Sequence, residues 1–193
     1  MEETKNKAAP VIRLQDVRKE YVVGDSHIHA LDGVSLTVSP GEFVCISGRS
    51  GSGKSTMLNM LAGLEKPTSG EIVILDKHIE NMSESARIRF RRQYIGFVFQ
   101  SFNLIDELNV EENIVMEQVG IVSHAEHKPS ELSGGEQQRV GIARALITKP
   151  PIVFADELTG NLDTKTSAEI MDLLTGLFRE SGTTFMLVSH DPD

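Results

Sequence analysis

Apolar and polar residues alternate in two stretches near the start of the chain, at residues 11–17 and 34–38. In the second stretch Val34, Leu36 and Val38 share one face, which is typical of a half-buried antiparallel strand. Further along, the apolar residues form unbroken runs at 43–46, 72–75, 95–99, 152–155 and 185–188. Short unbroken runs indicate strands that are covered on both faces, as in a sheet flanked by helices.

Helical periodicity lies between several of these runs. The clearest helix is expected to begin after Asp163, a suitable N-cap, and to stop at Gly182. Its apolar residues fall on one stripe, formed by Ile170, Leu173, Leu174, Leu177 and Phe178. A second stripe precedes Pro67 and contains Met57, Leu58, Leu61 and Leu64. Together the patterns predict an α/β fold, with a parallel sheet flanked by helices and an antiparallel β piece at the N-terminus.

Length and composition indicate a soluble globular protein. The chain has 193 residues, the size of one domain, and its single cysteine excludes an internal disulfide framework. Cys45 lies in an apolar run and is expected to be an inert core residue. Residues 1–10 are polar, are expected to form a loose tail, and lack the apolar core of a signal peptide. The sequence therefore predicts a cytoplasmic protein.

The charge balance bears on the class of partner. The formal net charge is −9, which disfavours binding to duplex DNA through a basic face, so no nucleic-acid partner is expected. One basic cluster stands out and contains Arg87, Arg89, Arg91 and Arg92. A contact to nucleic acid or lipid is one interpretation. The solvated face of an amphipathic helix is the expected one in a net-acidic protein.

A glycine-rich segment follows the apolar run at 43–46 and opens the helix before Pro67. It matches G-x-x-x-x-G-K-[ST], the phosphate-binding loop (P-loop), in which backbone N–H groups and the helix N-terminus surround the phosphates of a nucleotide. Lys54 would reach the β- and γ-phosphates, and the Ser55 hydroxyl would bind Mg²⁺. The residues expected to hold ATP are Gly48, Arg49, Ser50, Gly51, Ser52, Gly53, Lys54, Ser55 and Thr56. A simple glycine-rich turn is the alternative, and the motif alone does not separate kinases, GTPases and motor ATPases.

Two acidic residues follow the apolar run at 152–155, at the strand end where α/β sheets place ligand-binding groups. Asp156 is expected to hold Mg²⁺, and Glu157 to polarise the attacking water as a general base. The run at 185–188 leads similarly to His190, a polar contact for the γ-phosphate or the water. The alternative for each is an ordinary solvated side chain at a strand end.

Residues 132–139 read LSGGEQQR and precede an amphipathic segment. Ser133, Gly134 and Gly135 would form a second anion-binding helix end, or else an ordinary glycine-rich N-cap. The motif is the signature of ATP-binding cassette (ABC) ATPases, and the chain resembles that family from residue 11 to its end. The remaining landmarks follow the family's order: Tyr21 resembles the aromatic residue that stacks on adenine, Gln100 the Q-loop glutamine, Asp163 the last residue of the D-loop, and His190 the switch histidine.

Segments such as ALDGVSLTV and IGFVFQSFNL look like the macrolide-export and lipoprotein-release group of bacterial ABC ATPases. The resemblance implies an ATPase on the inner face of the cell membrane that powers a separate, membrane-embedded permease. It also implies a head-to-tail homodimer in the ATP-bound state. There Ser133 and Gly135 would contact a γ-phosphate bound by the other subunit, and Gln100 would link Mg²⁺ and the water to the permease.

Two other classes of function stay open. A soluble ABC ATPase acting on nucleic acid or ribosomes is one, although the net charge of −9 disfavours it. A nucleotide-binding module without turnover is the other.

Three features depart from the family pattern. Leu158 stands where this group usually has proline, which removes a fixed φ beside Glu157 and should have a modest effect. Only residues 114–131 separate Asn113 from Leu132, so the helical subdomain, expected at about 101–145 of a domain covering 11–193, is shortened by deletion or by omission. The chain also ends soon after His190, where members of the family continue.

Overall fold

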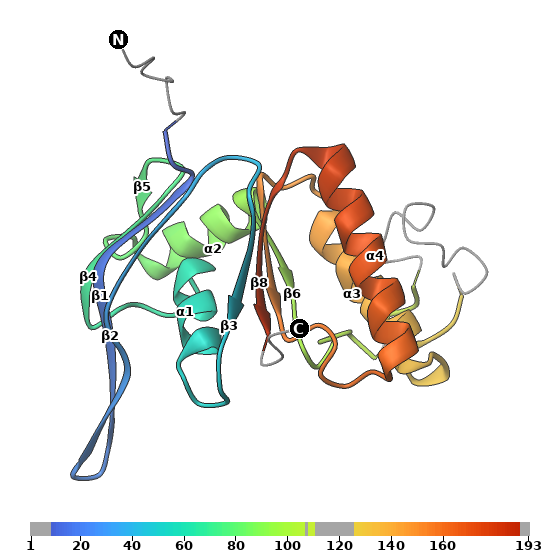
Figure 1. Cartoon of the computed structure of the whole chain (residues 1–193), viewed down its shortest axis with the longest axis horizontal. Coiled ribbons are helices and arrows are strands. Elements are labelled where there is room, and N and C mark those ends of the chain that lie inside the picture. Colours follow the sequence, from blue (N-terminus) through green and yellow to red (C-terminus); the bar gives the residue numbers. More distant parts are fainter. Residues whose placement is uncertain (1–8, 107, 111–125, 190–193) are drawn as a thin grey trace.

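The computed structural model describes residues 9–106, 108–110 and 126–189, and it contains two β-sheets (Figure 1). The antiparallel sheet has the order β2-β1-β4-β5 and is formed by β1 (Ile12–Val23), β2 (Ser26–Val38), β4 (Ser69–Ile74) and β5 (Lys77–His78). The parallel sheet has the order β3-β8-β7-β6 and is formed by β3 (Phe43–Ser47), β6 (Ile95–Val98), β7 (Ile152–Asp156) and β8 (Thr184–Ser189). The predicted α/β fold with an antiparallel N-terminal piece is confirmed.

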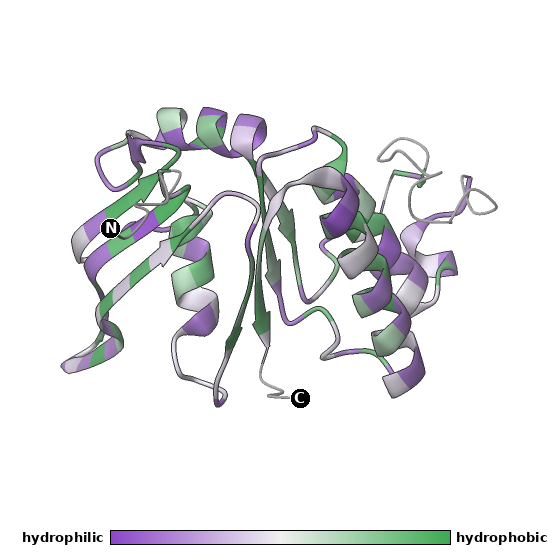
Figure 2. Ribbon diagram, turned by 45° about the horizontal axis from the view of Figure 1, so that its top comes forward, coloured by the Kyte–Doolittle hydropathy of each residue, from purple (hydrophilic) through white to green (hydrophobic). Residues whose placement is uncertain are grey.

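The helices cover the two faces of the parallel sheet. They are α1 (Lys54–Leu61), α2 (Glu84–Tyr94), α3 (Gly134–Leu146) and α4 (Thr164–Ser181), and a short 3-10 helix, η4 (Pro129–Glu131), precedes α3. Figure 1 shows α1 between the two sheets, and α3 and α4 on the opposite side of the parallel sheet. Hydrophobic residues are concentrated on the strands and on the helix faces turned toward them (Figure 2).

Each face of the parallel sheet contributes to its own hydrophobic core, because successive side chains of a strand point to opposite faces. One core joins Phe154 and Val188 to Leu58 of α1 and to the antiparallel sheet. The other joins Ala155 and Leu187 to residues of α3 and α4. The sheet therefore separates α1, which follows the glycine-rich segment, from α3, which begins in the LSGGEQQR motif.

Helix α4 forms as predicted. The Asp163 side chain accepts hydrogen bonds from the backbone N–H groups of Lys165 and Thr166, and Gly182 ends the helix with φ of 65°. Of the predicted stripe, Ile170 and Leu174 are buried and the other three residues are half-buried. Within the described ranges, no helix is long and apolar enough to cross a membrane.

Two predicted elements are wrong in detail. Residues 72–74 of the apolar run at 72–75 belong to β4 of the antiparallel sheet, where Ile72 and Ile74 are fully buried on one face and Val73 is only half-buried. The helix before Pro67 ends at Leu61, because Gly63 follows with φ of 67°, and Leu64 beyond it is 39% exposed.

The prediction for Cys45 is also wrong. Its side chain is exposed, because β3 lies at the edge of the parallel sheet.

The first two strands extend beyond the predicted stretches. They form a long hairpin whose register shifts at three places, which explains why alternation is visible only at its base.

The basic cluster of α2 is only partly a solvated face. Arg87 is buried and pairs with Glu84, and Arg91 donates a hydrogen bond to the carbonyl of Gly63 at 2.7 Å. The other two arginines of the cluster are exposed, as predicted.

Of the region expected to form the helical subdomain, the structure describes η4, α3 and the residues before 111 except 107. The shortened stretch falls mainly on residues outside that description.

Candidate active site

The glycine-rich segment joins the end of β3 to the start of α1, the strand–loop–helix arrangement that the motif requires. Gly51 and Gly53 adopt left-handed backbone conformations, with φ of 79° and 88°. A Cβ atom on Gly53 would lie 2.1 Å from the carbonyl oxygen of Ala30 on β2. Glycine at this position therefore lets β2 pack directly against the first turn of α1.

Helix α1 differs from the other α-helices of the described residues in its N-terminus. Helices α2, α3 and α4 begin with Ser83, Ser133 and Asp163, whose side chains accept hydrogen bonds from first-turn N–H groups. Helix α1 begins with Gly53, which has no side chain to do this. Because a helix N-terminus carries partial positive charge, the start of α1 is suited to an anion.

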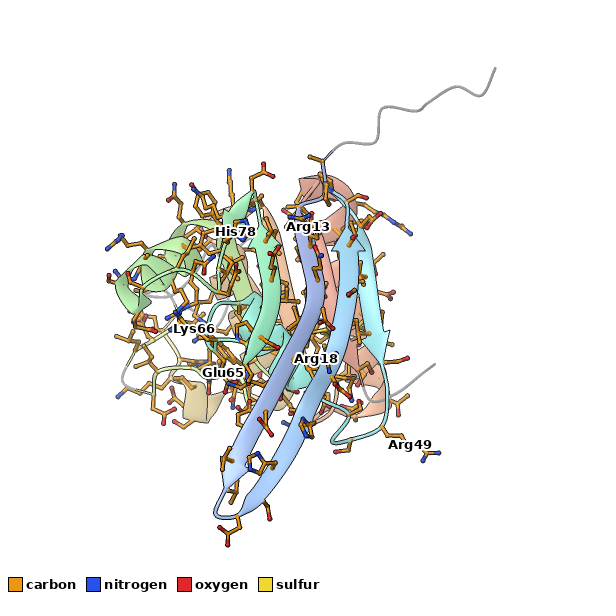
Figure 3. The ribbon with its side chains drawn as sticks, turned by 90° about the vertical axis from the view of Figure 1, so that its left-hand side faces the viewer. Arg13, Arg18, Arg49, Glu65, Lys66 and His78 are labelled. Carbon is orange, nitrogen blue, oxygen red and sulfur yellow. The ribbon has the colours of Figure 1, made fainter. Side chains whose placement is uncertain are left out.

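Lys54 is turned into the loop rather than into solvent. Its side chain is 7% exposed, and Nζ donates hydrogen bonds to the carbonyl oxygens of Gly48 and Arg49 at 2.7 and 3.1 Å. Arg49, by contrast, points away from the body of the protein (Figure 3). Of the loop residues predicted to hold ATP, Lys54 thus supplies the buried cation. Ser50, Gly51 and Ser52 are exposed, and Gly53 and Thr56 are half-buried.

The first turn of α1 meets the end of β7. The Ser55 hydroxyl donates a hydrogen bond to Oδ1 of Asp156 at 3.0 Å, although the two residues are 101 positions apart. Burial raises the pKa of Asp156, and Glu157 beside it raises it further, while the bond from Ser55 and the charge of Lys54 lower it. The structure therefore places a partly desolvated carboxylate against the glycine-rich segment.

Glu157 occupies a constrained turn directly after β7. Its φ is 45°, a left-handed conformation that is uncommon outside glycine, and its N–H donates to the carbonyl of Val188 at 2.9 Å. Leu158, at the departure from the family pattern, is buried with 3% exposure. The buried Leu158 side chain packs in the core that contains α3 and α4 and thereby anchors this turn.

The LSGGEQQR motif starts α3 and forms a capping box. The Glu136 carboxylate accepts hydrogen bonds from the Ser133 backbone N–H and hydroxyl at 2.7 and 2.6 Å. A Cβ on Gly135 would lie 2.6 Å from Cγ2 of Thr166 on α4, so the glycine permits close contact between these helices. Ser133 is thus an ordinary N-cap within its own chain, and its expected contact to a nucleotide stays a prediction.

Tyr21 connects the long hairpin to the segment after α1. Its hydroxyl donates to Oε2 of Glu65 at 2.6 Å, and Nζ of Lys19 lies 4.9 Å from the ring centroid. Burial raises the pKa of Tyr21, as does the bond to Glu65, while a bond with Thr56 of α1 lowers it. The side chain therefore reaches the first turn of α1, and its stacking on adenine stays a prediction.

The remaining candidates divide between described and undescribed residues. The carbonyl of Gln100 accepts a hydrogen bond from Nδ2 of Asn161 at 3.1 Å, which joins the predicted Q-loop to the predicted D-loop. Asp163 caps α4 and bonds Thr166, and these bonds lower the pKa of its carboxyl. His190 lies outside the described residues.

Sequence reasoning missed two residues that the structure brings to this region. Arg144 of α3 donates hydrogen bonds to the carbonyls of Phe102 and Asn103, and Thr166 packs against Gly135. Their partners lie 30 or more positions away along the chain. No local pattern could have indicated these contacts.

Comparison with known proteins gives consistent results. The family model described as ABC transporter matches residues 31–160. The lipoprotein-releasing system ATP-binding protein LolD of Alcanivorax borkumensis is 41% identical over 96% of this chain and 90% of its own length. The macrolide export ATP-binding/permease protein MacB of Chlorobaculum tepidum is 44% identical over 95% of this chain, which spans 31% of that relative's length.

A solved structure agrees with the fold. A dimeric ATP-binding cassette in a post-hydrolysis state bound to ADP and Pi superposes with a TM-score of 0.87, at 43% identity, over 93% of this chain and 88% of its own. The alignment with MacB is 202 positions long but includes only 95% of the 193 residues of this chain. Within the aligned region, that relative therefore contains residues that have no counterpart in this chain.

Proposed function

Because the chain belongs to the ABC transporter family and carries its ATPase domain, we propose that it binds and hydrolyses ATP to drive a membrane-embedded permease. The observation that carries the proposal is the 3.0 Å hydrogen bond between Ser55 and Asp156. It joins the glycine-rich segment to the acidic strand end. A surface turn and a pair of solvated acids would have no reason to meet.

The residues of this region fit ATP and Mg²⁺. The uncapped start of α1 and the buried ammonium of Lys54 suit the phosphates, and Tyr21 reaches the same helix turn to receive the adenine. The Ser55 hydroxyl and the Asp156 carboxylate are oxygen ligands of the kind that Mg²⁺ prefers, and Gln100 would add a third. Bound there, Mg²⁺ would neutralise charge on the β- and γ-phosphate oxygens.

Two side chains would serve the attacking water. Glu157 follows Asp156 at the same strand end, and as a general base it would take a proton from the water. The bond from its N–H to Val188 and the packing of Leu158 hold the turn that carries it. His190 would contact the γ-phosphate from the end of β8.

The two halves of the site point to a dimer. Helix α1 and helix α3 pack on opposite faces of the parallel sheet, so the α3 start of one chain would meet the ATP of a second chain rather than its own. In this head-to-tail homodimer Ser133, Gly134 and Gly135 would bind the γ-phosphate in trans, with Asp163 nearby. ATP would favour the dimer and hydrolysis would release it, a population shift driven by a ligand.

The names of the relatives support a permease as the partner. LolD is named as the ATP-binding protein of a lipoprotein-releasing system, and MacB as a combined ATP-binding and permease protein for macrolide export. We infer a peripheral protein on the cytoplasmic face of the membrane. The net charge of −9 argues against nucleic acid as the partner.

The test is the mass of the Glu157→Gln variant in solution, with and without Mg-ATP. We expect a monomer that becomes a dimer with ATP, because the variant still binds ATP but does not hydrolyse it. The matched control, Lys54→Ala in the same variant, should stay monomeric because the buried cation is lost. A Glu157→Gln chain that binds ATP and remains a monomer would contradict the dimer, and unchanged turnover in that variant would contradict the role of Glu157.

A further inference from the structure

The segment that carries Gln100 has an unusual backbone. Phe102 and Asn103, which follow it closely, have φ of 61° and 47°. Both values lie in the left-handed region, which bulky residues such as phenylalanine rarely adopt. Two such residues in succession persist only where the surrounding structure holds them in place.

Arg144 of α3 stabilises these two residues by hydrogen bonds. Its Nη2 donates a hydrogen bond to the carbonyl oxygen of Phe102 at 3.0 Å, and its Nη1 donates to the carbonyl oxygen of Asn103. The planar guanidinium thus binds both strained residues at once, a fork that a lysine cannot reproduce. Burial lowers the pKa of Arg144, which is consistent with a charge partly removed from water.

A second contact fixes the segment at Gln100 itself. Nδ2 of Asn161 donates to its carbonyl oxygen at 3.1 Å, and Asn161 lies in the turn that leads into α4. The segment also runs along α3. A Cβ on Gly141 would be 3.8 Å from the Phe102 carbonyl oxygen, and one on Gly134 would be 3.8 Å from the Phe102 ring. The segment is therefore held against α3 at Phe102 and Asn103, and against the turn after β7 at Gln100.

We propose that Arg144 is a positioning residue that fixes the conformation of residues 100–103 and thereby the place of Gln100 at the ATP site. The inference rests on the proposed function, in which Gln100 serves Mg²⁺ and the attacking water. Arg144 lies on the same helix that Ser133 begins. Any shift of α3 on dimerisation would therefore move Gln100 together with the trans phosphate contacts.

The experiment compares ATP turnover in Arg144→Ala and Arg144→Lys. For Arg144→Ala we expect kcat to fall about tenfold to a hundredfold, since a misplaced group near the reacting atoms has effects of this order. The KM for ATP should stay within about twofold, because the P-loop and Tyr21 are unaffected. Arg144→Lys should lose less, because one ammonium can still reach one carbonyl.

A double-variant cycle separates positioning from general destabilisation. If Arg144 acts through Gln100, then Arg144→Ala should have no further effect on kcat in a Gln100→Ala background. A loss of the same size in both backgrounds would overturn the proposal. Arg179→Ala is the matched control, since Arg179 is an exposed arginine near the end of α4 and should leave kcat unchanged.

The outcomes distinguish this inference from the proposed function. Absence of ATP turnover and of ATP-dependent dimerisation in the unmodified chain would overturn the proposed function, and this inference with it. Normal turnover in the unmodified chain with a normal kcat in Arg144→Ala would overturn this inference alone. If Arg144→Ala does not fold, Arg144→Lys provides the test. A kcat in Arg144→Lys equal to that of the unmodified chain would overturn the role of the paired hydrogen bonds from Arg144.

Discussion

Substitution of Gly53 by alanine tests how closely β2 approaches the P-loop. The new Cβ would lie 2.1 Å from the Ala30 carbonyl oxygen and 3.0 Å from Cδ2 of Leu31, whereas ordinary contacts begin at 3.4 Å. The φ of 88° adds a second cost, because alanine is strained in the left-handed region. Gly51 offers a matched control, since its φ is 79° but a Cβ there would meet nothing within 4 Å.

The unfolding free energies of the two variants should therefore differ only by the cost of the close contact that a Cβ at residue 53 makes with β2. The left-handed conformation costs about 1–2 kcal/mol in each variant. Gly53→Ala should lose about 1–3 kcal/mol more of the unfolding free energy, as in overpacked sites. Relief of the contact requires a shift of roughly 1 Å between β2 and the loop, and a displacement of that size lowers turnover by about a hundredfold.

Urea unfolding followed by circular dichroism measures the stability difference, and steady-state ATPase assays measure turnover. We expect Gly51→Ala to fold with a modest loss of unfolding free energy. Gly53→Ala should lose clearly more unfolding free energy and clearly more ATP turnover. Equal unfolding free energies in the two variants would refute the close approach of Ala30. Unchanged turnover in Gly53→Ala would refute the link between this approach and the site.

Two further predictions concern contacts made by the site. In Ser55→Ala the pKa of Asp156 should rise further, because the hydrogen bond that Ser55 donates lowers this pKa in the unmodified chain. The Asp156 carboxylate would then become protonated at a higher pH, so the acidic limb of the pH profile of kcat/KM for Mg-ATP should move to higher pH. An unmoved acidic limb would contradict this. Gly135→Ala should lower the unfolding free energy by about 1–3 kcal/mol through its contact with Cγ2 of Thr166. Thr166→Ser removes that methyl group and should restore most of the loss, and a double variant as unstable as Gly135→Ala would contradict the contact.

The parts of the molecule that sequence alone predicted are those with local causes. Helix α4 has its own N-cap, apolar stripe and terminal glycine, and the P-loop has a strand before it and a helix after it. The acidic pair could be placed at a strand end because strands of parallel sheets end at a common edge. The Ser55–Asp156 contact follows from these two local predictions together.

The errors have causes that lie elsewhere in the chain. The pattern at 72–75 predicts a strand covered on both faces, because the pairing of this segment with β1 is not visible in its own residues. Cys45 looked buried because the apolar run around it does not reveal that β3 is an edge strand. Arg87 is buried through packing of α2 on the core, and the hold of Arg144 on residues 102 and 103 joins two distant segments.

The glycine start of α1 links the fold to the supply of nucleotide. A helix without its own capping side chain gains from a bound phosphate, and a ligand at a hundred times its Kd stabilises the folded state by about 2.7 kcal/mol. Under the proposed function, the concentration of ATP would therefore contribute to the folding equilibrium of this protein. Without nucleotide, α1 and its loop would then open more often, so this end of the parallel sheet would be the part of the fold most sensitive to the ATP concentration.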